Sequence, residues 1–394
     1  MIKKIVLAYS GGLDTSVILK WLQNTYNSEV ITYTSNLGQE IDKKQIIKNA
    51  KSLGVKKIII EDLQNTFVKD YVYPMIRGHA LYEGVYLLGT SIARPLIGKR
   101  QIEIAKKYKA FAVSHGATGK GNDQVRFELA YPYFGKKIKV IAPWREWKLK
   151  SRTDLINYAK KNKIPIPKDK KGAPPFSVDD NIFHTSTEGK ILENPKNSAP
   201  EFIFQRTKPL EKTPNKASIV KIDFKNGDPI SINGKRLSPE KLLEKLNQIA
   251  GNNGVGRVDL VENRFIGIKS RGVYETPGGT ILYIAHRAIE SVTLDKKTMH
   301  EKERIMPTYA ELVYNGYWFS KKRIKLQKIV DKKRNLVAGQ VVLKIFKGNV
   351  IILSRKTKNK AYSMKKVSFE ENKSFNKAKI ENFIKFHSKK LNKL

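Results

Sequence analysis

A short segment near the amino terminus combines residue types that bind phosphate. Residues 10–16 read S-G-G-L-D-T-S and follow an apolar run at residues 4–9. Two adjacent glycines let the backbone approach a ligand closely, and the free amides at the start of a helix attract anions. Ser10, Thr15 and Ser16 add hydroxyl donors. The segment predicts a phosphate-binding loop between a strand and a helix, and no P-loop or dinucleotide-binding fingerprint competes with it.

A second glycine-rich segment, residues 114–126, reads S-H-G-A-T-G-K-G-N-D-Q-V-R. Its glycines allow a close backbone approach, and Lys120 and Arg126 can face anions. Thr118, Asn122 and Asp123 place further donors and acceptors at close spacing. Such a loop suits a small zwitterion bound beside a nucleotide. We assign no proton-transfer role to His115, the single histidine of this segment.

Short apolar runs alternate with helix-like segments through the first 165 residues. We expect strands at 4–9, 29–33, 57–61 and 110–114, and helices at 15–23, 43–53 and 100–107. This alternation predicts an α/β fold in which a Rossmann-like parallel sheet carries helices on both faces. Ligands of such sheets bind beyond the carboxyl ends of the strands, so the loops after Tyr9, Tyr33 and Ser114 are the expected site.

The second half of the chain lacks regular strand–helix repetition and predicts an α+β domain. Pro165 and Pro167 mark a break, because neighbouring prolines favour extended structure. We expect strands at 217–224, 258–262 and 280–284, a helix at 238–250, a hairpin from 341–346 and 349–353, and a terminal helix near 376–394. The predicted domains are 1–166 for nucleotide binding, 167–365 for the other substrates and for multimerisation, and 366–394 as a basic helical arm.

The composition sets limits on function. The 394 residues are 40% hydrophobic and include no cysteine, which excludes disulfides and cysteine nucleophiles. The net charge is +40, yet 60 of the 76 basic residues are lysine, and they are spread along the chain. We therefore do not expect nucleic-acid binding, although residues 320–394 form a basic tail. There is no run of about 18 apolar residues and no leader-like amino terminus, so we expect a cytoplasmic protein without a membrane partner.

The segment 10–16 matches the loop S-G-G-x-D-[ST]-S of the ATP pyrophosphatases, which adenylylate an oxygen and release pyrophosphate. Within this family, the absence of cysteine disfavours the tRNA-thiolating enzymes that relay sulfur. It also disfavours GMP synthetase and asparagine synthetase, whose glutaminase uses a cysteine nucleophile. A lysidine-type tRNA-modifying enzyme and an ammonia-dependent NAD synthetase remain possible at this point.

Four longer motifs resemble the argininosuccinate synthase family. They are A-Y-S-G-G-L-D-T-S at 8–16, Y-L-L-G-T-S-I-A-R-P at 86–95, the 114–126 loop extended to 128, and G-R-V-D-L-V-E-N-R-F-I-G-I-K-S-R-G-V-Y-E-T-P at 256–277. Shorter matches lie at 141–145 and 191–196, and the likeness weakens beyond about residue 320. The resemblance implies that ATP, L-citrulline and L-aspartate form argininosuccinate, AMP and pyrophosphate through a citrullyl-AMP intermediate.

The resemblance also implies the site residues. Catalytic roles fall on Ser10, Asp14 and Asp123. ATP binding falls on Ala8, Tyr9, Ser10, Gly11, Gly12, Leu13, Asp14, Thr15, Ser16, Ser35 and Gly116. Aspartate binding falls on Thr118, Asn122 and Asp123. Citrulline binding falls on Tyr86, Ser91, Asn122, Arg126, Ser177, Ser186, Glu262 and Tyr274.

No dedicated metal site is expected, because no carboxylate or histidine cluster stands out in the sequence. Mg²⁺ should arrive with ATP, and Asp14 could either hold that ion through water or cap the helix. Family members are homotetramers with an exchanged carboxyl-terminal arm. An apolar stripe at Ile380, Phe383 and Ile384 is consistent with such an arm. The alternatives are a lysidine-type tRNA-modifying enzyme, which the motifs around Glu262 and Tyr274 disfavour, and a basic nucleic-acid-binding protein.

Overall fold

The computed structural model describes residues 3–117, 121–149, 151–165, 176–359, 361–363, 367 and 377–391, and its amino-terminal part is built on a parallel sheet. The sheet order is β3-β2-β1-β4-β5. Its strands are β1 (Lys4–Ala8), β2 (Glu29–Asn36), β3 (Lys57–Asp62), β4 (Ala112–Ser114) and β5 (Lys139–Ile141). All four pairings are parallel, so the predicted Rossmann-like sheet is confirmed.

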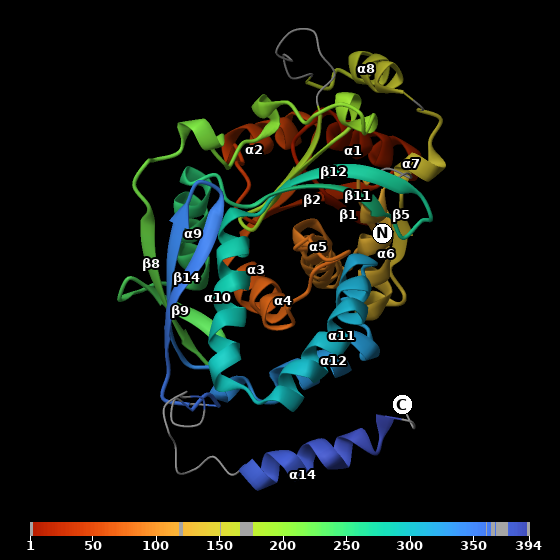
Figure 1. The fold of residues 1–394 in the computed structure, drawn as a ribbon. Coiled ribbons are helices and arrows are strands. Elements are labelled where there is room, and N and C mark those ends of the chain that lie inside the picture. The colour runs from red at the N-terminus through yellow and green to blue at the C-terminus, as the bar shows by residue number, and fades with distance from the viewer. Residues whose placement is uncertain are drawn as a thin grey trace.

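Helices cover both faces of this sheet, because successive side chains of a strand point to opposite faces. Ile5 and Leu7 pack with α1 (Leu13–Tyr26), α2 (Lys43–Ser52) and α8 (Arg152–Lys161). Val6 points the other way, toward α5 (Gly89–Lys107) and α6 (Asn122–Gly135). A short α7 (Pro143–Glu146) follows β5. Helices α1 and α5 therefore lie on opposite sides of β1 and β2 (Figure 1).

The second half of the chain forms two antiparallel sheets. One has the order β11-β12-β7-β6 and contains β6 (Ser177–Asp180), β7 (Thr185–Glu188), β11 (Arg257–Asn263) and β12 (Lys269–Glu275). The other has the order β10-β9-β8-β13-β14 and contains β8 (Ser218–Lys225), β9 (Asp228–Ile232), β10 (Lys235–Arg236), β13 (Gly339–Phe346) and β14 (Asn349–Lys356). The predicted β13–β14 hairpin is confirmed. Its two turn residues, Lys347 and Gly348, have φ of 42° and 79°, as a tight hairpin turn requires.

One predicted strand of this half is wrong. Residues 280–284 lie inside α10 (Pro277–Thr293), a helix that begins at a proline. Ile281, Leu282, Ala285, Ala288 and Ile289 are all buried, which is the spacing of one helical face. A five-residue apolar window is too short to distinguish that helical spacing from a buried strand.

Helices link the two sheets of this half. The longer ones are α9 (Pro239–Asn252), which confirms the helix predicted at 238–250, α11 (Lys296–Tyr314) and α12 (Lys321–Asp331). Short 3₁₀ turns lie at Lys190–Glu193, Glu201–Ile203, Leu210–Lys212 and Arg334–Leu336.

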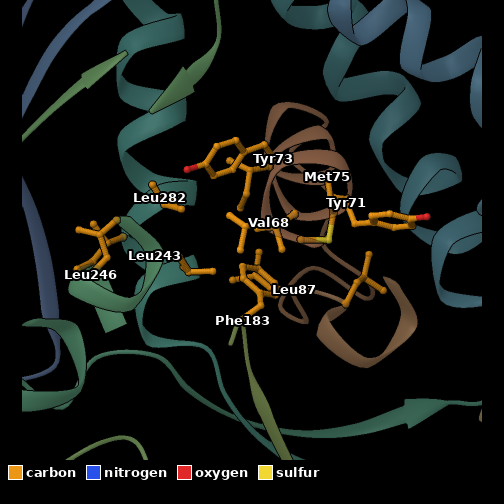
Figure 2. Packing of buried hydrophobic residues seen from close by; sticks show 14 of the residues in the cluster. Val68, Tyr71, Tyr73, Met75, Leu87, Phe183, Leu243, Leu246 and Leu282 are labelled. Atoms are coloured by element: carbon orange, nitrogen blue, oxygen red, sulfur yellow. The ribbon is translucent and has the colours of Figure 1, made fainter. Parts of the chain in front are cut away.

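The largest core joins the two halves of the chain (Figure 2). Its centre is a helical segment made of α3 (Gln64–Phe67), a π-helical turn (Val68–Val72) and α4 (Tyr73–Arg77). Val68 and Met75 from this segment are fully buried in the same cluster as Leu243 of α9 and Leu282 of α10. The helices of the second half are therefore fixed to the amino-terminal part by apolar packing.

The carboxyl-terminal helix α14 (Lys377–Ser388) lies apart from the body in Figure 1. Ile380, Phe383 and Ile384 are 47%, 62% and 60% exposed. Both predicted domain boundaries, after residues 166 and 365, lie outside the described residues. Among the residues that the structure describes, no helix is long and apolar enough to cross a membrane.

Candidate functional site

The predicted phosphate-binding loop connects β1 to α1. Ser10 Oγ lies 3.0 Å from Thr15 Oγ1, and the Gly12 N–H donates to Ser10 Oγ at 3.3 Å. Gly12 is the N-cap of α1, and the first amide bonded within the helix is that of Ser16, which donates to the Gly12 carbonyl. The preceding amides of the first turn can therefore face an anion. Asp14 lies in this first turn, beyond the cap position.

The shape of this loop depends on Gly11. Its φ is +83°, and a Cβ at this position would lie 2.7 Å from Cγ1 of Ile46 in α2. The carbonyl of Gly11 also accepts a hydrogen bond from Nδ2 of Asn49 at 3.0 Å. Only glycine satisfies both the positive φ and the close approach of α2.

A cavity of about 700 Å³ opens at the carboxyl ends of β1 and β2. The four-stranded sheet of the second half, β11-β12-β7-β6, forms its opposite wall. Most of the predicted site residues line this cavity. They are Ala8, Tyr9, Ser10, Asp14, Thr15, Ser35, Tyr86, Gly116, Asn122, Asp123, Arg126, Ser177, Ser186, Glu262 and Tyr274.

The other predicted residues that the structure describes do not line the cavity. Gly11, Gly12 and Leu13 belong to the phosphate-binding loop itself. Ser16 is buried behind the loop, where its Oγ lies 3.0 Å from the Tyr9 hydroxyl. Ser91 is fully buried in α5, and its Oγ has no hydrogen-bond partner among the described residues. Thr118 lies outside the described residues.

An ion-pair network crosses the cavity wall. Arg94 of α5 places Nη2 2.8 Å from Asp123 Oδ2 and 2.6 Å from Asp179 Oδ2. Arg126, one turn after Asp123 on α6, donates from Nη1 to Asp123 Oδ1 at 3.0 Å. Arg126 also donates from Nε to the Tyr314 carbonyl at 3.0 Å. Both oxygens of Asp123 therefore accept from a guanidinium group, whereas Asp179 shares a single guanidinium nitrogen with Asp123.

The two carboxyl groups respond differently to this environment. Burial raises the pKa of Asp123, but Arg94 and Arg126 outweigh burial and hold it below its ordinary value. Burial is also the largest influence on Asp179 and raises its pKa. Arg94 lowers that pKa and the Asp123 carboxylate raises it again, so the pKa of Asp179 stays above its ordinary value.

Aromatic rings and a carboxylate form the far wall. The rings of Tyr86 and Tyr274 stack with centroids 4.2 Å apart. The Tyr274 hydroxyl donates to Glu262 Oε2 at 2.9 Å, and both side chains are almost completely buried. In the pairing of β11 with β12, Glu262 lies opposite Ser270 and Tyr274 lies opposite Val258, so the Tyr274 side chain extends along its strand over Gly272 to reach Glu262. The cavity thus combines a phosphate-binding loop with charged groups of both signs.

Comparisons with known proteins identify the family. The model of the arginosuccinate synthase N-terminal HUP domain matches residues 4–165, and that of the arginosuccinate synthase C-terminal domain matches residues 176–393. The chain belongs to the argininosuccinate synthase family. The argininosuccinate synthase of Pelagibacter ubique is 77% identical over 389 residues, which cover 99% of this chain and 98% of the relative. Those of Granulibacter bethesdensis and Brucella suis are 57% and 56% identical, covering at least 99% of this chain and 94% and 97% of the relatives.

Membership of the argininosuccinate synthase family makes the chain an ATP-dependent carbon–nitrogen ligase of arginine biosynthesis. It also favours the ligase over the lysidine-type tRNA-modifying alternative. The parallel sheet is the HUP domain of this family, in agreement with the fold class predicted from the sequence.

Two charged residues of the argininosuccinate synthase cavity were not among the predicted site residues. Arg94 lies within the matched motif at 86–95, and Asp179 lies two residues after Ser177. The usable signal was their position beside predicted site residues, whereas their charged partners became visible only in the structure. Other lining residues that were not predicted are Tyr33, Thr34, Leu37, Gln39, Thr90, Ala93, Ile97, Ala117, Gly121, Phe127, Val178, Asp180, Asn181, Glu188 and Arg264.

A second buried cluster lies away from the cavity. Potential ligand atoms of His79, His286 and Glu290 all lie within 4.8 Å of one another. The ammonium group of Lys302 forms an ion pair with Glu290, so the cluster already contains a compensating cation. We interpret it as a buried ion pair with two neighbouring histidines rather than as a metal centre.

Proposed function

We propose that the chain joins L-citrulline and L-aspartate to form argininosuccinate and converts ATP to AMP and pyrophosphate. Citrulline would first attack the α-phosphorus of ATP through its ureido oxygen, and the aspartate amine would then displace AMP from the citrullyl-AMP intermediate. The observation that carries this proposal is the convergence of three groups of residues on one cavity: the phosphate-binding loop, Asp123 with Arg126, and Glu262 with Tyr274.

In this proposal ATP lies on the loop from Ala8 to Ser16, with Ser35 and Gly116 on either side. The free amides of α1, together with Ser10 and Thr15, would bind the departing pyrophosphate. Such fixed donors stabilise charge as it develops without having to reorganise. Mg²⁺ would arrive with ATP. Asp14 lines the cavity beside Ser10 and Thr15, which fits an ion held by one carboxylate and by substrate phosphates.

Residues of α6 would contact both amino acids. The Asp123 carboxylate would accept a hydrogen bond from the ammonium group of the substrate L-aspartate. Asn122 and Thr118 would donate hydrogen bonds to the carboxylates of that substrate. Arg126 would bind the citrulline carboxylate, since its Nη2 makes no hydrogen bond within the described part of the chain. Glu262 would hold the citrulline ammonium. Hydroxyl groups of Tyr86, Ser177, Ser186 and Tyr274, which line the cavity, would orient the neutral ureido group. Ser91 is fully buried and does not line the cavity, so we propose no direct contact for its hydroxyl.

We further propose a cytoplasmic homotetramer with the domain limits predicted above. The exposed apolar side chains of α14 support a docking role for this helix. Aspartate, ATP and pyrophosphate are anions, so the positive charge of the chain favours their approach.

The proposed reaction is tested by measuring pyrophosphate release from ATP. We expect release that depends on citrulline, and argininosuccinate only when aspartate is also added. Pyrophosphate release that is indifferent to citrulline would overturn the proposal.

A further inference from the structure

The proposed reaction requires a proton acceptor, because an aspartate amine enters as an ammonium group that has no lone pair to attack with. The acceptor must line the cavity near the group that binds the ammonium. Asp123 itself is poorly suited, since both of its oxygens accept from Arg94 or Arg126. These guanidinium groups stabilise its charged form, so it can attract an ammonium but binds a proton weakly.

Asp179 occupies the neighbouring position in a different environment. It projects from β6 on the opposite wall of the cavity, and one nitrogen of Arg94 separates its Oδ2 from Asp123 Oδ2. The Asp179 side chain is 27% exposed, so a substrate in the cavity can contact it. When the environments of two neighbouring carboxyl groups make their proton affinities different, one group can stay charged while the other accepts and releases a proton.

We propose that Asp179 is the general base that takes a proton from the ammonium group of L-aspartate, an inference that rests on the proposed function. One ammonium proton moves to a carboxylate oxygen of Asp179, and the freed lone pair forms the new C–N bond to the activated carbon of citrullyl-AMP. The C–O bond to AMP then breaks, and its electron pair stays on AMP. A second proton leaves the attacking nitrogen for a phosphate oxygen of the departing AMP, so atoms and charges balance.

The surroundings of Asp179 support this role. Arg94 from α5, Asp123 from α6 and Thr90 from α5 are the groups that act on its carboxyl. His184, which directly precedes β7, contacts Thr90, but burial is the largest influence that lowers its pKa, to about 3, so it is neutral at physiological pH. Its Nε2 lies 2.8 Å from Thr90 Oγ1, which fixes Thr90. The raised pKa of Asp179 brings its proton affinity closer to that of an amine.

The decisive variant is Asp179→Asn, assayed in two steps. Citrulline-dependent exchange of labelled pyrophosphate into ATP reports adenylylation without aspartate, and argininosuccinate formation reports the complete reaction. We expect exchange within about twofold of the unmodified protein, and a loss of argininosuccinate formation of about 10²–10⁴-fold near neutral pH. The remaining rate should rise about tenfold per pH unit, because only substrate whose amine is already deprotonated can react.

Two further variants separate proton transfer from folding. Asp179→Glu keeps a carboxyl group and should recover much of the ligation rate with the pH profile of the unmodified protein. Asp180→Asn is the matched neighbour. Its carboxylate pairs with Arg206 and accepts from Thr185 at 2.6 Å, so any loss should affect both steps together without the steep pH dependence.

The inference is overturned if Asp179→Asn ligates normally, keeps the unmodified pH profile, or loses both steps equally without recovery in Asp179→Glu. Failure of the proposed function looks different, because the unmodified protein would then show no citrulline-dependent exchange.

Discussion

The carboxylate of Asp123 is held by two guanidinium groups in the cavity. It lies in the first turn of α6, where acidic residues interact favourably with the helix dipole. Arg94 and Arg126 both bond to it, and Arg126 is only 5% exposed. Breaking a buried pair of this kind typically costs about 3–5 kcal/mol, because the remaining charge is left uncompensated. Substitutions here must therefore be judged by stability as well as by activity.

Replacing Asp123 with alanine should weaken the use of aspartate more than the adenylylation of citrulline. We expect the KM for aspartate to rise at least about tenfold, which corresponds to about 1.4 kcal/mol of lost binding, while pyrophosphate exchange changes by less than about threefold. The two assays are steady-state ligation at varied aspartate and exchange without aspartate. Asp123→Asn, which keeps the shape of the side chain, controls for altered packing. An equal loss in both assays would contradict the assigned role.

At the scale of elements, α10 and α11 are joined by a charged pair rather than by apolar packing alone. Glu290 of α10 and Lys302 of α11 form a buried ion pair, with His79 and His286 beside the carboxylate. Burial raises the pKa of Glu290, but His286, His79 and Lys302 outweigh it and hold that pKa well below its ordinary value. The pair therefore stabilises the fold above the unfolded pKa of a glutamate, about 4.3, and this contribution is lost as pH falls further.

Glu290→Gln should lower the free energy of unfolding by about 3–5 kcal/mol at neutral pH, because Lys302 remains buried without its counterion. Urea unfolding measures this change. When the measurement is repeated at decreasing pH, the difference in free energy of unfolding between the variant and the unmodified protein should become smaller below about pH 4. The matched control is Glu303→Gln, whose carboxylate pairs with Arg287 at the surface and is 47% exposed, so that its effect should stay within about 1 kcal/mol. Equal effects of the two substitutions would refute the buried pair as a structural link.

At the scale of the whole molecule, two features stand out: a large positive charge and an exposed terminal helix. The net charge is +40 and the surplus is lysine, whereas the charged residues among the described cavity lining are arginine, aspartate and glutamate. Helix α14 has no buried residue, although Ile380, Phe383 and Ile384 are apolar. Covering these side chains with another subunit would remove apolar area from water and stabilise an assembly.

Removal of all residues after Ser374 should therefore reduce the number of subunits from the proposed four. Light scattering measures the mass of the assembly directly. The full-length double variant Phe383→Ser, Ile384→Ser should shift the mass in the same direction, since it removes apolar contacts and keeps the chain length. Lys389→Ser on the same segment serves as the control and should keep the original mass. An unchanged subunit count after truncation rules out a role for the helix in assembly.

The sequence predicted four of the five amino-terminal strands, because each of these is a short apolar run, but it did not predict β5, which has only three residues. It was less informative for the second half. Residues 280–284 were assigned to a strand because their apolar run is compatible with both structures, and only the packing of α10 against α9 and α4 decides for a helix. The predicted hairpin was easier, since Lys347 and Gly348 supply the turn locally.

The site likewise has one part that is local in the sequence and another that depends on residues far apart in the chain. The loop at residues 10–16 is contiguous, so its chemistry and its helix start can be read from neighbouring residues. Its need for glycine at position 11 also depends on the close approach of Ile46 in α2, which only the tertiary structure shows. Family resemblance added residues from distant motifs, and most of them line one cavity. The ion pairs of Arg94 with Asp123 and Asp179 could not be read in this way, because their partners are 29 and 85 positions away.

The sequence by itself therefore determined the parallel sheet, the phosphate-binding loop and, through its motifs, the family. Tertiary structure alone decided which charges meet in the cavity and how each carboxyl is shifted. The physical reason is that a local motif fixes backbone conformation over a few residues, whereas proton affinity depends on burial and on charges that only folding brings within a few ångströms.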